Sequence, residues 1–122
     1  MPRYAALIYG PVGDESADVP ADVMEAVMAE YYAFGEAAGD VIAGGEALHP
    51  TSTATTVTVK DGKGGEAVFT DGPFAETKEV LGGFYLLDCA DLDEALKWAQ
   101  QIPGAWHGRV EVRPCIDFGD ES

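Results

Sequence analysis

Two segments of the sequence carry apolar side chains at nearly every position, and they constrain the fold more than any other feature. Residues 3–9 and residues 84–89 alternate only weakly, so a strand formed by either segment would be apolar on both faces. Residues 20–38 and 92–102 have helical periodicity, and two helices can cover only one face of a small sheet. A large apolar patch is rarely left exposed. We therefore expect a second copy of the chain to pack sheet to sheet on the other face.

The order of the expected elements leads to a specific topology. Two strand-helix-strand units flank a hairpin, which predicts an α+β fold of the ferredoxin-like split βαβ type with an inserted β-hairpin. Pairing of two such sheets would form a dimeric α+β barrel. The expected strands are residues 3–9, 40–48, 53–59, 66–70, 84–89 and 109–114, with residues 61–65 as the hairpin loop.

Local signals mark the helix ends. Pro20 suits the first turn of the first helix, and Gly39 suits its end. Asp91 is expected to cap the second helix, with Glu94 returning the hydrogen bond. Pro103-Gly104 is expected to stop that helix. Gly44-Gly45 indicates a bulge or a close backbone approach in the second strand.

The composition limits the class of protein. A chain of 122 residues with 47% apolar content is the size of one domain. The net charge of -15 disfavours nucleic acid and anionic membrane surfaces as partners. The sequence contains no apolar run of membrane-spanning length and no signal segment. We therefore expect a cytoplasmic protein.

The two cysteines and the absence of familiar motifs narrow the chemistry. Cys89 and Cys115 lie in strand-like surroundings without CxxC spacing, so we expect two buried, unpaired thiols on strands separated by another strand. The sequence has no GxGxxG, Walker or GxSxG motif and no paired histidines at metal spacing. We therefore expect neither a cofactor nor a metal.

The segment from Asp71 to Glu79, with Gly82-Gly83 close behind it, concentrates turn residues and charges between two expected strands. The Asp71 carboxylate could bond backbone amides of its own turn, or it could serve as a general base or polar anchor in a cleft. Lys78 could neutralise a nearby acid or hold an anionic ligand. We expect both residues to converge with Glu46 on one cleft.

Other residues complete this candidate site. Phe74 would form part of the wall, and Gly82 and Gly83 would let the backbone pass close by. Tyr9 could point its hydroxyl into the cleft. His49 is either a half-exposed loop residue or an acid/base group oriented by Glu46. The other histidine, His107, is read as a structural turn residue.

Five segments carry a resemblance to a known family: residues 4–10, 44–48, 53–57, 71–79 with 82–83, and 110–114. In these segments the sequence resembles the YCII-related proteins, also known as the DGPF family. The resemblance implies a domain over residues 1–116 followed by an acidic tail at residues 117–122, a dimeric α+β barrel, and a homodimer. It implies a His/Asp pair in the cleft, which does not map by motif onto His49. It also implies a partner in an extracytoplasmic-function sigma-factor pathway.

Two classes of function remain open at this point. In the first, the protein is a binder of a small polar or aromatic metabolite, or a cofactorless enzyme acting on one, with Asp71, Lys78, Glu46 and His49 in catalytic roles. In the second, it is a regulatory interaction module of the sigma-factor pathway. A cleft with buried acids would favour the first class, and an exposed segment around residue 74 would favour the second.

Overall fold

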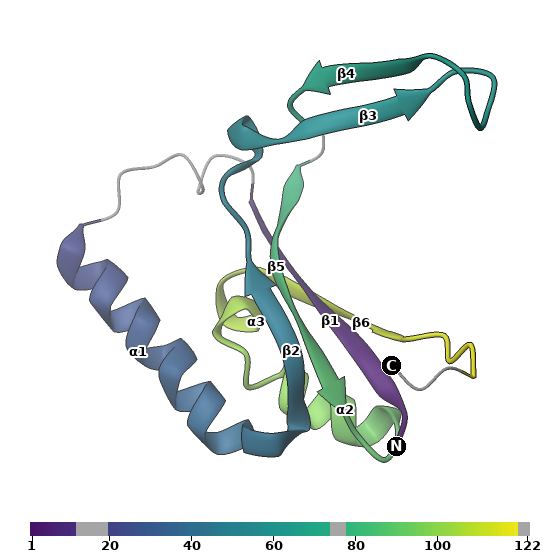
Figure 1. Ribbon diagram of the computed structural model, residues 1–122. Coiled ribbons are helices and arrows are strands. Elements are labelled where there is room, and N and C mark those ends of the chain that lie inside the picture. The colour runs from purple at the N-terminus through teal and green to yellow at the C-terminus, as the bar shows by residue number, and fades with distance from the viewer. Residues whose placement is uncertain (12–19, 74–77, 120–122) are drawn as a thin grey trace.

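The computed structural model describes residues 1–11, 20–73 and 78–119, and Figure 1 shows their arrangement. Four strands form one sheet, three α-helices lie on one side of it, and two further strands form a separate hairpin. The elements in chain order are β1 (Arg3–Pro11), α1 (Ala21–Ala38), η2 (Gly39–Val41), β2 (Ile42–Ala47), η3 (Thr51–Thr53), β3 (Thr55–Val59), β4 (Ala67–Asp71), β5 (Glu79–Asp88), α2 (Leu92–Ala99), α3 (Pro103–His107) and β6 (Arg109–Pro114).

The main sheet is antiparallel and has the strand order β2-β5-β1-β6. The two segments that are apolar on both faces form its centre, where Tyr4 pairs with Leu87 and Leu7 pairs with Phe84. Helix α1 connects β1 to β2, while α2 and α3 connect β5 to β6. This interleaving of two βαβ units confirms the predicted ferredoxin-like topology with an inserted hairpin.

The core lies between the helices and one face of the sheet. Tyr4 and Ala6 of β1 and Leu87 of β5 are buried there against Phe34 of α1 and Ala99 of α2. Val110 and Val112 of β6 pack on the edge of this core, as their alternation predicts. All three α-helices therefore cover the same face of the sheet.

None of the helices in residues 1–11, 20–73 and 78–119 lies on the opposite face, and its central side chains are only half-buried. Ala5 pairs with Leu86, and Leu7 pairs with Phe84, so these four apolar side chains share that face. Leu86 and its neighbour Leu87 therefore point to opposite sides, and Leu87 is fully buried under the helices. A charged residue would reach the helix-free face at position 86 and would disrupt the core at position 87.

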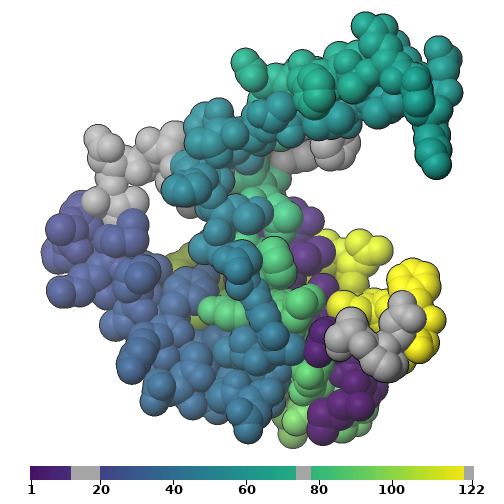
Figure 2. All heavy atoms as spheres, in the orientation of Figure 1, coloured from purple at the N-terminus to yellow at the C-terminus, as the bar shows by residue number. Residues whose placement is uncertain are grey.

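The hairpin of β3 and β4 forms its own two-stranded sheet and projects from one end of the main sheet (Figures 1 and 2). Val57 pairs with Phe69, and Val59 pairs with Ala67, so one face of the hairpin is apolar. Phe69 is 68% exposed and Val57 is 57% exposed. The hairpin thus presents large apolar side chains that the described residues leave uncovered.

Several boundaries differ from those predicted. Strand β5 begins at Glu79 and includes Gly82 and Gly83, because a bulge absorbs Gly82 where the pairing of β1 with β5 shifts. A one-residue shift in β2 falls at Ala43, just before the expected glycine pair. Pro103 ends no helix but occupies the first turn of α3, where proline is well tolerated.

The two cysteines are both free thiols, but only one is buried. The backbone amide of Cys89 donates to the carbonyl of Pro2, and that of Cys115 donates to the carbonyl of Arg3. Strand β1 therefore separates the two cysteines, as predicted. The prediction of burial is wrong for Cys115, because this residue lies just past the end of an edge strand and is exposed.

Candidate functional site

Helix α1 packs tightly on the sheet only near its C-terminal end. The ring of Phe34 is buried and lies 5.1 Å, centroid to centroid, from the ring of Tyr85 on β5. In the preceding turns, Val27, Met28 and Tyr31 instead line a cavity of about 590 Å³. The facing wall comes from α3 and from the adjoining ends of β1, β2 and β5. The cavity has the size typical of small-molecule sites.

Glycines form much of the wall opposite α1. A Cβ atom on Gly83 would lie 2.9 Å from the carbonyl oxygen of Glu46, and a Cβ atom on Gly45 would lie 2.6 Å from that of Phe84. The neighbouring strands can approach this closely only because those side chains are absent. The lining glycines are Gly10, Gly45, Gly82, Gly83, Gly104 and Gly108.

Tyr31 supplies a hydroxyl group to the cavity. Burial, together with the nearby Tyr85, raises the pKa of Tyr31, and burial raises the pKa of Tyr85 as well. The backbone of Gly104, close to the Tyr31 hydroxyl, opposes part of that rise in pKa. The hydroxyl of a neutral tyrosine can donate its proton to a bound molecule.

A carboxylate and an imidazole meet at the same cavity. Nε2 of His107, which lines the cavity from α3, lies 3.8 Å from Oε1 of Glu30 on α1. Within the part of the chain that the structure describes, this Oε1 is buried and has no hydrogen-bond partner. The side chain of Glu30 as a whole is 39% exposed and that of His107 is 67% exposed, so water reaches the pair although this one oxygen is buried and unsatisfied. The pair is therefore a candidate acid/base group.

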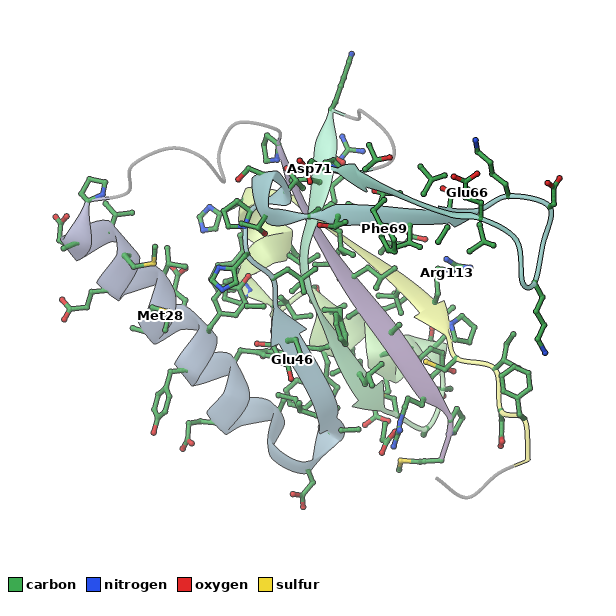
Figure 3. All side chains as sticks on the ribbon, turned by 45° about the horizontal axis from the view of Figure 1, so that its top comes forward. Met28, Glu46, Glu66, Phe69, Asp71 and Arg113 are labelled. Atoms are coloured by element: carbon green, nitrogen blue, oxygen red, sulfur yellow. The ribbon has the colours of Figure 1, made fainter. Side chains whose placement is uncertain are left out.

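The structure brings four of the predicted site residues to this cavity: Tyr9, Glu46, Gly82 and Gly83 all line it. Figure 3 places Glu46 on β2 and Met28 on α1, the two elements that bound the cavity on opposite sides. Glu46 is exposed, and it pairs with Phe84 across the sheet. Because Phe84 lies on the helix-free face, the Glu46 side chain is directed to that face and not under α1.

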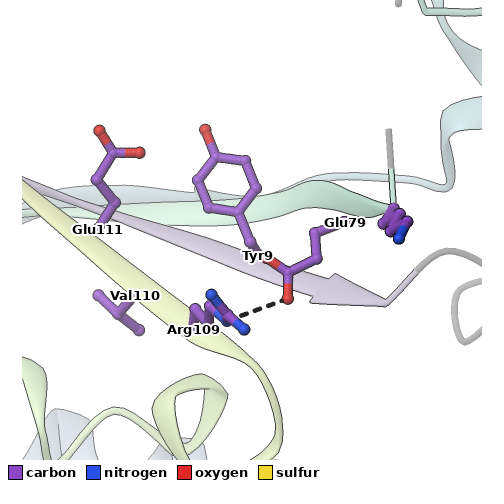
Figure 4. Close-up of a pocket in the computed structure, with 6 residues that line it drawn as sticks. Tyr9, Glu79, Arg109, Val110 and Glu111 are labelled. Atoms are coloured by element: carbon purple, nitrogen blue, oxygen red, sulfur yellow. Dashed lines mark ion pairs between the residues drawn. The ribbon is translucent and has the colours of Figure 1, made fainter. Parts of the chain in front are cut away.

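A second cavity, of about 660 Å³, lies where Tyr9, Lys78 and β6 meet (Figure 4). Nε of Arg109 lies 3.3 Å from Oε2 of Glu79 in this cavity. Tyr9 pairs with Arg109 across the sheet and lines both cavities. Lys78 and Glu46 thus line different cavities of one protomer.

The remaining predicted residues lie elsewhere. Asp71 is exposed at the end of β4, where it pairs with Thr55, and it does not occur among the described residues that line the two cavities. His49 is exposed in the segment after β2 and is likewise absent from both linings. Phe74 falls outside the described residues. The roles predicted for these residues remain predictions.

Sequence reasoning missed Glu30, Tyr31 and the role of His107. The apolar helical pattern does include Tyr31, but nothing local links position 30 to position 107, and only the packing of α1 near α3 brings them together. Among the described residues, no group of three or more His, Cys, Asp or Glu side chains could hold a metal ion. In that part of the chain, no helix is long and apolar enough to cross a membrane.

The strand order, the single helix-covered face and the inserted hairpin define the class: this is an α+β protein with the ferredoxin-like split βαβ fold. Within that class, the chain belongs to the YCII-related domain family, whose model matches residues 3–119.

Comparison with individual proteins adds two findings. An uncharacterized protein of Rhizobium meliloti (strain 1021) is 52% identical over 69 residues, which is 55% of this chain and 53% of the relative. The chain thus matches about half the length of that relative. A solved structure of 5-chloro-2-hydroxyhydroquinone dehydrochlorinase (TftG) from Burkholderia phenoliruptrix AC1100, in complex with 2,5-dihydroxybenzoquinone, is 15% identical with a TM-score of 0.48, covering 91% of this chain and 90% of that chain.

Proposed function

We propose that this protein binds a small polar or aromatic molecule in the cavity between α1 and the end of the sheet, and that His107 and Glu30 perform acid/base work on it. The observation that carries the proposal is the buried Oε1 of Glu30, which lacks a hydrogen-bond partner within the described residues and lies 3.8 Å from Nε2 of His107. Core packing alone gives no reason to hold a carboxylate oxygen in this way.

The geometry assigns a role to each group. The Glu30 carboxylate faces Nε2, so it orients the imidazole and stabilises positive charge that develops on the ring. Nδ1 is then the ring nitrogen that can take a proton from a bound molecule or return one. The distance of 3.8 Å exceeds a hydrogen bond, and such contacts often tighten when a ligand binds. Tyr31 would donate its hydroxyl proton to an acceptor on the same molecule.

Binding should therefore depend on the groups that line the cavity. We would screen a library of small aromatic and polar metabolites by ligand-observed NMR, and then compare Tyr31→Phe with Tyr32→Phe. Tyr32 is the adjacent helix residue, is 72% exposed and does not line the cavity. The expected result is about tenfold weaker binding for Tyr31→Phe alone, the scale of one lost hydrogen bond to a ligand.

The two histidines separate this proposal from the one based on sequence. His107→Asn should abolish any turnover, whereas His49→Asn should abolish it if the sequence-based candidate is correct. Turnover that survives in His107→Asn would exclude the acid/base role of the pair while leaving the binding cavity in place.

We also propose that the protein is a homodimer. The helix-free face presents Ala5, Leu7, Phe84 and Leu86. The hairpin, which extends from the end of the sheet away from α1 (Figure 1), carries a second apolar face. A second copy packed on the sheet would lie beneath the hairpin, so one partner could cover both surfaces. Each hairpin would then act as an arm that grips the other protomer.

A cytoplasmic location and a partner in a sigma-factor pathway remain predictions that come from the sequence and its family resemblance. The regulatory alternative would require a surface that stays free after dimerisation. Capture of a sigma factor by the intact dimer, unaffected by Tyr31→Phe, would favour that alternative over the binding cavity.

A further inference from the structure

Two tyrosines from opposite walls line the cavity between α1 and the sheet. Tyr31 comes from α1 and Tyr85 comes from β5, and both side chains are half-buried. Tyr85 pairs with Ala6, a fully buried residue of the core, so the Tyr85 side chain lies on the helix-covered face. The Phe34 ring packs on the Tyr85 ring and lies one turn after Tyr31 on the same face of α1. The two tyrosines are therefore neighbours in the cavity.

Both tyrosine rings lie closely against glycine backbone. A Cβ atom on Gly104 would lie 3.1 Å from the hydroxyl oxygen of Tyr31, and a Cβ atom on Gly45 would lie 3.0 Å from Cδ1 of Tyr85. Both glycines also line the cavity. In the described part of the chain, no group accepts the proton of either tyrosine hydroxyl. The cavity thus holds two phenol donors that a bound molecule can use.

Burial keeps both phenols protonated. It raises the pKa of Tyr31 and the pKa of Tyr85, and the nearby Tyr85 raises that of Tyr31 further. Both hydroxyls therefore stay neutral through the pH range in which a histidine such as His107 gains and loses a proton. They remain hydrogen-bond donors while that acid/base group works.

Two ionisable groups beside the tyrosines act in opposite senses. The Glu30 carboxylate contributes to the raised pKa of Tyr31, so it disfavours negative charge at that position. Its Oε1 lies 3.8 Å from Nε2 of His107, and a proton gained by the imidazole would offset the carboxylate charge. Once His107 has taken a proton, negative charge on the bound molecule would meet a neutralised ion pair and two donors.

We propose that Tyr31 and Tyr85 donate to one oxygen atom of the bound molecule and stabilise negative charge on it, which makes carbonyl compounds that form enolates the substrate class. This inference rests on the proposed function of the same cavity. Nδ1 of His107 removes a proton from the carbon beside the carbonyl group. The electrons of that C–H bond form a C=C bond, and the π electrons of the carbonyl group move to its oxygen, which the two hydroxyls hold. Return of the proton from Nδ1 to this oxygen gives the enol and needs no other reactant.

4-Nitrophenol would serve as a stable analogue of the enolate, because its ionised form carries negative charge on oxygen and absorbs light that the neutral form does not. Absorbance titrations on either side of its ionisation would give the dissociation constants of both forms, with enough salt to screen the net charge of the protein. We expect the ionised form to bind at least about tenfold more tightly, the scale of charge-assisted hydrogen bonds.

Tyr31→Phe and Tyr85→Phe should each bring the two dissociation constants close together, because each variant removes one donor and keeps the ring. Tyr32→Phe is the matched control, since Tyr32 is 72% exposed and does not line the cavity. It should keep the full preference for the ionised form. Melting temperatures equal to that of the wild type would show that the packing of the three variants is intact.

The same titration of His107→Asn separates the hydroxyls from the imidazole. The preference for the ionised form should persist in this variant, because both donors remain. Loss of the preference in His107→Asn and its survival in Tyr85→Phe would overturn the inference and assign the negative charge to the imidazole, while the cavity would remain the binding site. If 4-nitrophenol shifts no NMR resonance of the lining residues at millimolar concentration, the proposed binding function fails together with this inference.

Discussion

At the scale of single residues, Gly45 connects the candidate site to the stability of the sheet. Its φ of 157° lies in a region that side chains rarely adopt, and a Cβ atom there would lie 2.6 Å from the carbonyl oxygen of Phe84. The adjacent Gly44 differs, since a Cβ atom on it would make an ordinary contact of 3.6 Å with Leu86. Two neighbouring glycines therefore serve different purposes.

This difference gives a matched test. Gly45→Ala should destabilise the fold by about 1–3 kcal/mol, because the strands must move apart to admit the new methyl group. Gly44→Ala should leave stability unchanged or slightly raised, since alanine loses less backbone entropy on folding. Urea unfolding at one protein concentration would compare the two variants. Equal changes in the free energy of unfolding for the two variants would show that the close approach of the strands at Gly45 does not make a side chain there destabilising.

Residue-level chemistry was the least predictable part of the molecule. The prediction placed Glu46, Tyr9 and the Gly82-Gly83 pair in one cleft together with Asp71 and Lys78. The structure places the first four around one cavity and Lys78 at another, and Asp71 is in neither lining among the described residues. The pairing of Glu30 with His107 could not be foreseen, because the two positions are 77 residues apart in the chain (107 − 30 = 77) and meet only through helix packing. The pattern of a single sequence does not encode such a contact.

At the scale of elements, local signals predicted most boundaries. The amide of Glu94 donates to Asp91 Oδ1 at 2.9 Å, as the cap requires, while the Glu94 side chain accepts from the amide of Ala90 rather than from that of Asp91. Strand β6 has the bounds that were predicted. Helix α3 was missed because Pro103-Gly104 was read as a stop, although proline in a first turn is equally consistent with a new helix.

An ion pair joins the two central strands at one end of the sheet. Arg3 on β1 and Asp88 on β5 are paired in register, and Arg3 Nε donates to Asp88 Oδ1 at 2.8 Å. The hydrogen bond from Arg3 lowers the pKa of Asp88 in the folded state. The stabilising contribution is therefore fully present above the ordinary pKa of an aspartate and is lost as the pH falls through the lowered value.

The corresponding prediction concerns acid unfolding. Asp88→Asn should lower the melting temperature at pH 7, and the difference from wild type should shrink as the pH falls below about 4. A double-mutant cycle with Arg3→Gln would isolate the pair from other effects of each change. A difference that stays constant from pH 7 to pH 2 would show that the loss comes from something other than the ionised carboxylate.

At the scale of the whole molecule, the proposed dimer predicts opposite outcomes for neighbouring hairpin positions. Phe69 lies on the apolar face of β4, and Thr70 lies on the other face. Phe69→Glu should raise the dimer dissociation constant at least about tenfold, because a charge would be buried in an apolar contact. Thr70→Glu adds the same charge at an exposed position and should leave it unchanged.

Sedimentation analysis across a range of concentrations would measure both dissociation constants, and Leu86→Glu would test the face of the main sheet in the same way. A wild-type protein that remains monomeric at micromolar concentration would contradict the dimer. Weaker association for Leu86→Glu together with no effect of Phe69→Glu would confine the interface to the sheet and exclude the hairpin arm.

The hairpin of β3 and β4 is expected to become ordered under different conditions from the four-stranded sheet. Within the described part of the chain, its strands pair only with each other, and its largest apolar side chains are left exposed. An isolated two-stranded hairpin is marginally stable in water. If a second copy covers these side chains, the stability of the hairpin arm depends on protein concentration, whereas the folding of the four-stranded sheet does not. Dilution would then loosen the arm first, so that one polypeptide would contain two regions with separate melting behaviour.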